Sequence, residues 1–281
     1  MSKKQRLRAF LVFGVILILL LCGIFLVGKP NGAEEPIGEV MKNEVLHETN
    51  RVRLGPLSVN PGLISAFTLT GIFLVFCVIV RLFVIPRFKK IPGRFQLFLE
   101  EAVGMFDRLS QDSSPHRHNF LGAYVFAAGA YIFIGTLFEL FGFQVVTESG
   151  RSAAMPAPLS DINGAIAMGF LSYGVILFGG LLANGFSGML HALKDFSLPI
   201  SMSFRLFGAL LSGALVTELV YYYMSLSYVL PVVVGVLFTL LHALIQAYVL
   251  TMLTALFYGE VTEKKEPKPK EKHVKKQPAS K

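Results

Sequence analysis

Arg205 lies near the start of a long apolar run, and the residues that follow it are small. Across residues 199–258 the only other formally charged side chain is that of Glu218. At about 100° per residue, several small residues fall on the helix face that carries Arg205, namely Gly208, Ala209, Ser212 and Gly213. Small residues let a second helix approach closely. The pattern therefore predicts an arginine presented to another helix, with a buried carboxylate of that helix as its counter-ion.

Other polar residues in the apolar runs predict an ion path. Thr239, His242 and Gln246 share one face of the last run at spacings of three and four residues. On a helical wheel Glu218 lies about 220° from Arg205, on the opposite face and nearer the outside. We expect the two faces to meet in a polar seam, with Glu218 and His242 toward the outside and Gln246 deeper. A lone buried histidine is usually a packing group, but this grouping favours a proton or cation path.

Two further ionisable residues receive different interpretations. A charged group at the centre of a membrane helix costs about 2.5–3.5 kcal/mol on insertion scales, so each one calls for a specific role. Glu139, in the string LFELFGF, is expected deep in the third apolar run and is interpreted as functional. Arg81 lies four residues from the end of its run, where its side chain reaches the headgroups, and is interpreted as structural.

The composition is that of a membrane protein. Of 281 residues, 53% are hydrophobic and 16% are charged, and the mean hydropathy is +0.60, which excludes a soluble domain of this length. Much of the net charge of +8 lies in terminal segments and short loops, which indicates membrane topology rather than nucleic-acid binding. Cys22 and Cys77 both lie inside apolar runs, so no disulfide framework, metal site or cofactor is expected.

Six stretches are long and apolar enough to cross a bilayer as helices. We therefore expect an all-α polytopic membrane bundle of about six membrane helices, with one amphipathic helix on the cytoplasmic side. The first run follows four basic residues, as a signal peptide does, but its 19 residues and the lack of a convincing small-x-small cleavage site favour a retained anchor. The expected spans are residues 9–27, 62–85, 120–146, 162–186, 198–226 and 228–258.

Basic residues predict the orientation of the bundle. Residues 87–117 carry six arginines and lysines, and the tail after Glu263 is dominated by lysine, whereas residues 30–61 are acidic. By the positive-inside rule both termini and the 87–117 loop face the cytoplasm. The lysine-rich tail has three prolines and no apolar face, so it is expected to be a solvated, disordered segment.

An amphipathic helix is expected at residues 93–111, after Pro92. Its acidic residues fall largely opposite its apolar face, which is typical of a helix lying in the membrane interface. The apolar face either docks a partner or packs on the membrane helices, and the pattern is compatible with both. The residues of that face are Phe95, Phe98, Leu99, Ala102, Phe106 and Leu109.

Several strings resemble the subunit a family of the F-type ATP synthase. PISMSFRLFGALLSG, followed by LIQAYVLTMLTALFYGE, resembles the two C-terminal helices of that family, and SFRLFG is a highly specific string. APLSDINGAIAMGFLSY is similar to the family's segment that opens the fourth span here, and IPGRFQLFLEEAVGMF is similar to its cytoplasmic surface helix. The resemblance covers roughly residues 56–260 in the family's order.

The resemblance implies a function. A member is the proton-translocating stator subunit, which forms two half-channels against a ring of c subunits and couples ion flow to rotation and ATP synthesis. Its implied partners are that ring, the b subunit of the stator stalk, the rest of the F-type ATP synthase and the lipid bilayer. We expect no enzyme activity in isolation, no nucleic acid and no directly bound nucleotide, since no phosphate-binding glycine loop is present. The implied location is an energy-coupling membrane, a bacterial plasma or inner membrane.

The resemblance also assigns roles to residues. Arg205 matches the family's essential rotor-facing arginine, and Gln246 matches the glutamine that faces it from the last helix. Glu218 and His242 are expected on the proton path. The remaining residues expected along the path are Glu139, Asp161, His191, Lys194 and Asp195.

The chain departs from the family pattern at three positions. Ala209 stands where the family usually has Asn, and Ala214 where it usually has Glu or His. Thr239 occupies the partner position on the last helix. Because Glu218 and His242 each lie about one turn beyond these positions, we expect the acid–imidazole pair to be displaced rather than lost.

Four parts of the chain are expected. Residues 1–28 form an N-terminal membrane anchor or uncleaved signal, and residues 29–61 an extracytoplasmic segment. Residues 62–260 form the membrane domain similar to subunit a, and residues 261–281 a basic cytoplasmic tail.

Two other classes of protein predict different features of the sequence. A secondary transporter or ion channel, in which an intramembrane Arg205 binds an anion, predicts repeat symmetry or matching helix breaks, and no internal repeat is evident in the sequence. A non-transporting membrane scaffold would have no role for Glu139, Glu218 and His242, although ionisable residues in membrane helices cost free energy.

The expected orientation is testable by cysteine labelling. In a background lacking Cys22 and Cys77, a cysteine at Asn43 should react with a membrane-impermeant reagent added outside. A cysteine at Ser280 should react only after permeabilisation. Mature protein that lacks residues 1–27 by mass spectrometry would contradict the six-span topology.

Overall fold

The fold is described from a computed structural model of the chain. It describes Val15, Ile18 and residues 36–46, 52–54, 57–115, 118–146, 152–222 and 233–263. The expected first span, residues 9–27, and the lysine-rich tail lie outside the described residues, apart from Val15, Ile18 and the tail's start.

Helices dominate the described residues, as the apolar runs predict. Five of them are long and apolar enough to cross a membrane: Pro61–Arg87, Phe120–Leu137, Ile162–Leu193, Ser197–Val220 and Gly235–Thr262. These correspond to the last five expected spans, so the all-α polytopic membrane fold is confirmed. The α-helices are α2 (Ile37–Leu46), α3 (Pro61–Ile79), α4 (Arg94–Ser113), α5 (His118–Leu137), α6 (Ile162–Leu193), α7 (Ser197–Tyr222) and α9 (Leu240–Thr262).

Short segments of other geometry flank the long helices. Two strand pairs are antiparallel: β1 (Val52–Leu54) with β2 (Leu57–Val59), and β3 (Gln144–Val146) with β4 (Ser152–Ala154). Two π-helical segments are η1 (Val80–Val84), which ends α3, and η4 (Gly235–Thr239), which precedes α9. Two 3-10 segments are η2 (Ile85–Arg87) and η3 (Phe138–Phe141).

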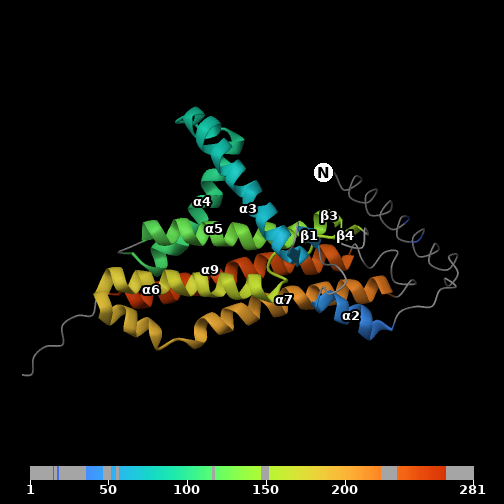
Figure 1. The fold of residues 1–281 in the computed structure, drawn as a ribbon. Helices are drawn as coiled ribbons and strands as arrows, with labels where there is room; N and C mark the ends of the chain where they lie inside the picture. The colour runs from blue at the N-terminus through green and yellow to red at the C-terminus, as the bar shows by residue number, and fades with distance from the viewer. Residues whose placement is uncertain are drawn as a thin grey trace, which may run out of the picture.

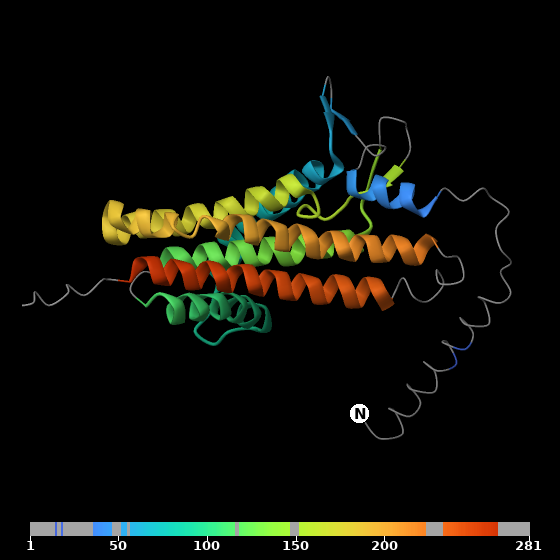
Figure 2. The ribbon, with the colours of Figure 1, turned by 90° about the horizontal axis from the view of Figure 1, so that it is seen from below.

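Four long helices lie side by side and form the body of the molecule (Figures 1 and 2). α9 packs against both α5 and α6, and α6 also packs against α7. The helix α3 touches this body along its first half, where Ser65 and Leu69 are buried, and then leaves it at a steep angle. The helix α2 lies against α7.

The third span ends earlier than predicted, and this corrects the expected position of Glu139. The helix α5 stops at Leu137, and the chain continues through η3 to Gly142, whose φ of 61° favours glycine. Glu139 therefore lies in the 3-10 segment beyond the helix, not deep in a span. Hydropathy did not reveal this end because the residues on both sides of it are equally apolar.

The fourth span is broken by a sharp kink. Within α6, Gly185 has φ 62° and ψ −149°, so two helical segments meet at this residue. The kink places Gly180 and Gly188 back to back, since a Cβ on Gly188 would collide with the carbonyl oxygen of Gly180. The predicted end of the span, Phe186, falls directly after the kink. The segment beyond it leads through a turn at residues 194–196 into α7.

The amphipathic helix exists as predicted, and its two halves differ. In the second half of α4, Phe106 packs edge-on against Phe126 at 5.8 Å and fills the space next to Gly129 on α5. In the first half, Phe95 and Phe98 are exposed. The second half is therefore a packing helix of the bundle, while the first half has an open apolar face.

Glycines set the closest helix contacts of the body. The ring of Tyr258 on α9, only 2% exposed, lies directly against Gly179 on α6. The carbonyl oxygen of Ser113 lies against Gly259 in the same way. Since lipid tails are as apolar as leucine, such close packing supplies much of the attraction between membrane helices.

Replacing Gly179 should therefore destabilise the body. A methyl group there overlaps the Tyr258 ring, and overpacking of this kind costs about 1–3 kcal/mol. Gly179→Ala should lower the thermal unfolding midpoint of the purified chain in detergent. Gly174→Ala, on the same helix with nothing within 4 Å of the new Cβ, is the matched control. Equal midpoints for the two variants would contradict this account of the packing.

Candidate functional site

Arg205 lies on the open face of α7. Met202 and Leu206 on the same helix are buried in the body, whereas Arg205 and Phe204 are exposed. A Cβ added at Gly208 or Gly213 would meet nothing within 4 Å. At Gly208 and Gly213 this face is therefore unoccupied within the described part of the chain, and it has room there for a helix from outside.

Gln246 on α9 lies beneath the arginine. Its side chain is 6% exposed, and it lines one narrow cleft together with Arg205. The cleft is too small to hold a water molecule, so the arginine stem packs directly over α9. The other residues that line it are Met202, Leu206, Val249, Leu250 and Leu253.

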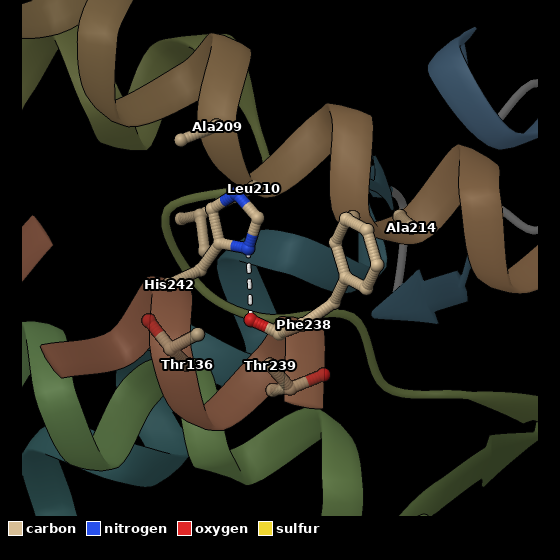
Figure 3. Close-up of a pocket in the computed structure, with 8 residues that line it drawn as sticks. Thr136, Ala209, Leu210, Ala214, Phe238, Thr239 and His242 are labelled. Carbon is tan, nitrogen blue, oxygen red and sulfur yellow. Dashed lines mark hydrogen bonds between the residues drawn. The ribbon is translucent and has the colours of Figure 1, made fainter. Parts of the chain in front are cut away.

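A separate cavity lies further along α7, between α5, α7 and the start of α9 (Figure 3). Its volume of about 10 Å³ is close to the minimum that one water molecule requires. Its polar lining comes from His242, Thr136 and Thr239. The apolar lining comes from Ala209, Leu210, Gly213, Ala214 and Phe238.

The imidazole of His242 is held by two contacts. Its ring stacks on that of Phe238, with centroids 5.7 Å apart and planes 20° apart. Its Nδ1 lies 2.8 Å from the carbonyl oxygen of Phe238. Because a carbonyl oxygen only accepts, Nδ1 carries the proton and donates it, which leaves Nε2 to accept. Figure 3 shows the other side of the ring directed toward α7.

The π-helical turn before α9 ends at the start of the helix face that carries Thr239, His242 and Gln246. The π-helical segment η4 ends at Thr239, and the regular helix α9 starts at Leu240. The spacing from Thr239 to His242 and Gln246 is therefore helical, as the sequence predicts. Single π turns inside helices are frequent at functional sites, but composition gives no signal for them.

Two acidic residues belong to the elements around this cavity. Glu139 lies in η3, which contacts η4, and it follows the cavity residue Thr136 by three positions. Glu218 lies one turn beyond Ala214 on α7 and is half-buried. The structure thus gathers Glu139, Glu218 and His242 at one end of the body.

The predicted residues of the opposite path lie beyond the kink of α6. The Nδ1 atom of His191 is buried and has no hydrogen-bond partner among the described residues. Nearby, the hydroxyl of Tyr173 donates to the carbonyl oxygen of Ala192 at 3.1 Å. Lys194 and Asp195 are exposed in the turn between α6 and α7. A buried ring nitrogen of this kind calls for an ordered water molecule as its hydrogen-bond partner.

Asp161 has a structural role. Its carboxylate accepts from the backbone N–H of Asn163 at 3.4 Å and so caps the first turn of α6. It also lies against Gly62 at the start of α3. Both residues line the mouth of an apolar groove of about 560 Å³ between α3, α5 and α6.

Comparison with known proteins decides the family. The family described as "ATP synthase A chain" matches residues 65–259 of the chain. The chain belongs to the ATP synthase A chain family. Together with the five long apolar helices, this makes it an integral, multi-pass membrane protein.

Curated relatives agree at low identity. ATP synthase subunit a of Cereibacter sphaeroides (strain ATCC 17025 / ATH 2.4.3) is 26% identical over 179 residues, or 59% of this chain and 69% of the relative. ATP synthase subunit a of Actinobacillus pleuropneumoniae serotype 3 (strain JL03) is 26% identical over 129 residues, or 43% of this chain and 48% of the relative.

Sequence reasoning missed two contributors to the cavity of this ATP synthase family member. Thr136 is a single hydroxyl within an apolar run, and it gave no periodic signal. Phe238 resembles any lipid-facing aromatic residue, yet its ring and carbonyl oxygen position His242. Neither role is readable without the fold, because both depend on which helices meet.

The cavity next to Ala214 should admit water. Thiols react as thiolates, which require a hydrated site. In a background lacking Cys22 and Cys77, Ala214→Cys should therefore react with a small permeant thiol reagent at least about tenfold faster than a dry site. Ala165→Cys, fully buried in the core between the helices, provides that dry control. Equally slow reaction at both positions would show that the cavity is dry.

Proposed function

We propose that the chain is the proton-translocating stator subunit of an F-type ATP synthase. It forms two half-channels against a rotating ring of c subunits, each with a carboxylate in the membrane, and it couples proton flow to ATP synthesis. One observation carries the proposal: Arg205 lies exposed on a small-residue face of α7 that the described part of the chain leaves open. The chain performs no chemistry on ATP itself, and its other partners are the b subunit of the stator stalk and the remaining subunits.

The guanidinium of Arg205 explains why the ring carboxylate gives up its proton. A cation within a few ångströms lowers the pKa of a carboxylate by about 1–3 units. Each carboxylate that passes Arg205 therefore ionises and releases its proton. The guanidinium cannot itself lose a proton at accessible pH, so it also blocks direct leakage between the two half-channels.

Gln246 supports the arginine from below. It is buried in the cleft that Arg205 covers, so its amide lies on the side of α7 away from the ring. An amide offers both a donor and an acceptor without a charge. It therefore suits a position that orients the guanidinium and does not compete with the ring carboxylate.

The outer half-channel is formed at the end of the body where His242 lies. Glu218 and Glu139 deliver protons to the small cavity, and Nε2 of His242 accepts them from water held there. The protonated imidazole then gives its proton to the empty ring carboxylate. This arrangement replaces the acid–imidazole pair that Ala214 and Thr239 lack. Asp161, at the start of α6, takes up protons on the outer side.

The inner half-channel is formed at the opposite end. The unpartnered Nδ1 of His191 receives the proton that leaves the ring near Arg205. Asp195, exposed in the turn between α6 and α7, passes it to the cytoplasmic water. Each proton that completes both steps yields about 2.3 kcal/mol per 100 mV of membrane potential.

Substitutions of Arg205 test the proposal. Arg205→Ala should abolish ATP synthesis and ATP-driven proton pumping in membrane vesicles while the complex still assembles. Arg205→Lys should fail nearly as badly, because lysine lacks the planar fork and loses its proton when desolvated. Both are measured at equal amounts of assembled complex.

The matched control is Arg81, another exposed arginine on a membrane helix. Arg81→Ala should retain coupled pumping, since its side chain reaches the headgroups from the end of α3. Substantial pumping by Arg205→Lys would refute the mechanism. Loss of assembly in Arg205→Ala would indicate that the arginine acts in membrane insertion instead.

A further inference from the structure

The junction of α3 and α4 carries a cluster of positive charge. It projects away from the four helices of the body (Figure 1). Across residues 80–99 the sequence has no Asp or Glu. Four basic side chains of this junction are exposed, and none of them is paired with a carboxylate of the described residues; they are Arg87, Lys89, Lys90 and Arg94.

Large apolar side chains are interleaved with these cations. Ile91 is 87% exposed and Phe98 is 68% exposed, and Phe88 and Phe95 are also exposed. Apolar surface of this extent is unfavourable in water. It becomes favourable at the boundary between hydrocarbon and headgroups, where basic amphipathic segments lie. Because α3 crosses the membrane and ends through η2 at Arg87, the junction lies at that boundary.

The backbone of the junction is fixed by one side chain. The backbone N–H of Lys89 donates to Oε1 of Gln96 at 3.1 Å, and Nε2 of Gln96 donates to the carbonyl oxygen of Lys89 at 3.1 Å. The same Nε2 lies 2.7 Å from Glu100. The two reciprocal bonds tie the loop to the first turn of α4. The cations are thus held near one another before any ligand binds.

We propose that this junction, residues 87–98, binds the phosphate groups of anionic phospholipids and so fixes the depth of α3 and α4 in the membrane. The charge is complementary to such lipids, and the interleaved apolar residues fit their glycerol and upper acyl regions. An acidic protein partner would account for the cations but not for Ile91 and Phe98 at the end of a membrane helix. Each basic residue near an anionic surface adds roughly a fivefold preference. The inference rests on the membrane fold and does not depend on the proposed proton path.

The absence of tryptophan makes the proposal directly measurable. The chain has none, so Phe88→Trp gives the full chain a single fluorophore inside the junction. The protein is reconstituted in phosphatidylcholine vesicles that contain dibrominated phosphatidylglycerol or dibrominated phosphatidylcholine as the quencher. We expect the anionic quencher to be at least about fivefold more effective at low salt. The ratio should fall toward one in 1 M salt, where the screening length is about 3 Å.

Two controls separate a local site from a general preference. Phe67→Trp, at a position 72% exposed on the first half of α3, reports lipid away from the cluster and should give a ratio near one. In the Phe88→Trp chain, joint replacement of Lys89, Lys90 and Arg94 by Gln should remove the preference. Lys194→Gln, an exposed lysine elsewhere, should not change it. Equal quenching by both lipids at Phe88→Trp, or a ratio that salt leaves unchanged, would overturn the proposal.

Discussion

A permanently charged guanidinium on the open side of a membrane helix is the constraint on which the structure depends. Its burial in hydrocarbon is costly, and its stem must still be held in one position. The structure meets both needs by burying Met202 and Leu206 while Gln246 supports the stem from α9. The charged end stays on a face where glycines leave space. The position of Arg205 therefore depends on how firmly α7 and α9 are fixed.

The body is packed tightly at one end and loosely at the other. Toward the end of α9, Gly179 lies directly against Tyr258, and Gly259 lies directly against Ser113. Toward its start, the helices pass through the π-helical η4 and the 3-10 η3, and a small cavity forms beside His242. Close packing holds the helix, and irregular turns make room for hydration. Under the proposed function both are needed, because the chain must conduct protons without deforming.

The sequence predicted the elements better than their ends. Apolar runs were sufficient for the last five expected spans, which lie within the described residues. The spacing of Thr239, His242 and Gln246 correctly predicted one helical face, because it depends on local periodicity. The position of Glu139 was wrong, since hydropathy does not change where α5 ends. The kink at Gly185 and the turn η4 were not predicted. Both are irregularities of the backbone, and hydropathy carries no signal for them. The cavity residue Thr136 could be found only from the fold.

The loose attachment of α3 raises the question of which contacts keep a stator subunit from rotating. Beyond Leu69 this helix leaves the body, and its junction with α4 projects away from the four packed helices. Bound lipid fixes the depth and tilt of such a segment because its charges remain at the headgroups. Lipids flow laterally, however, so they offer no lasting resistance to rotation in the membrane plane. Under the proposed function, the reaction to a turning ring must therefore pass through protein contacts, and the packed half of α4 has such contacts with α5 and α9.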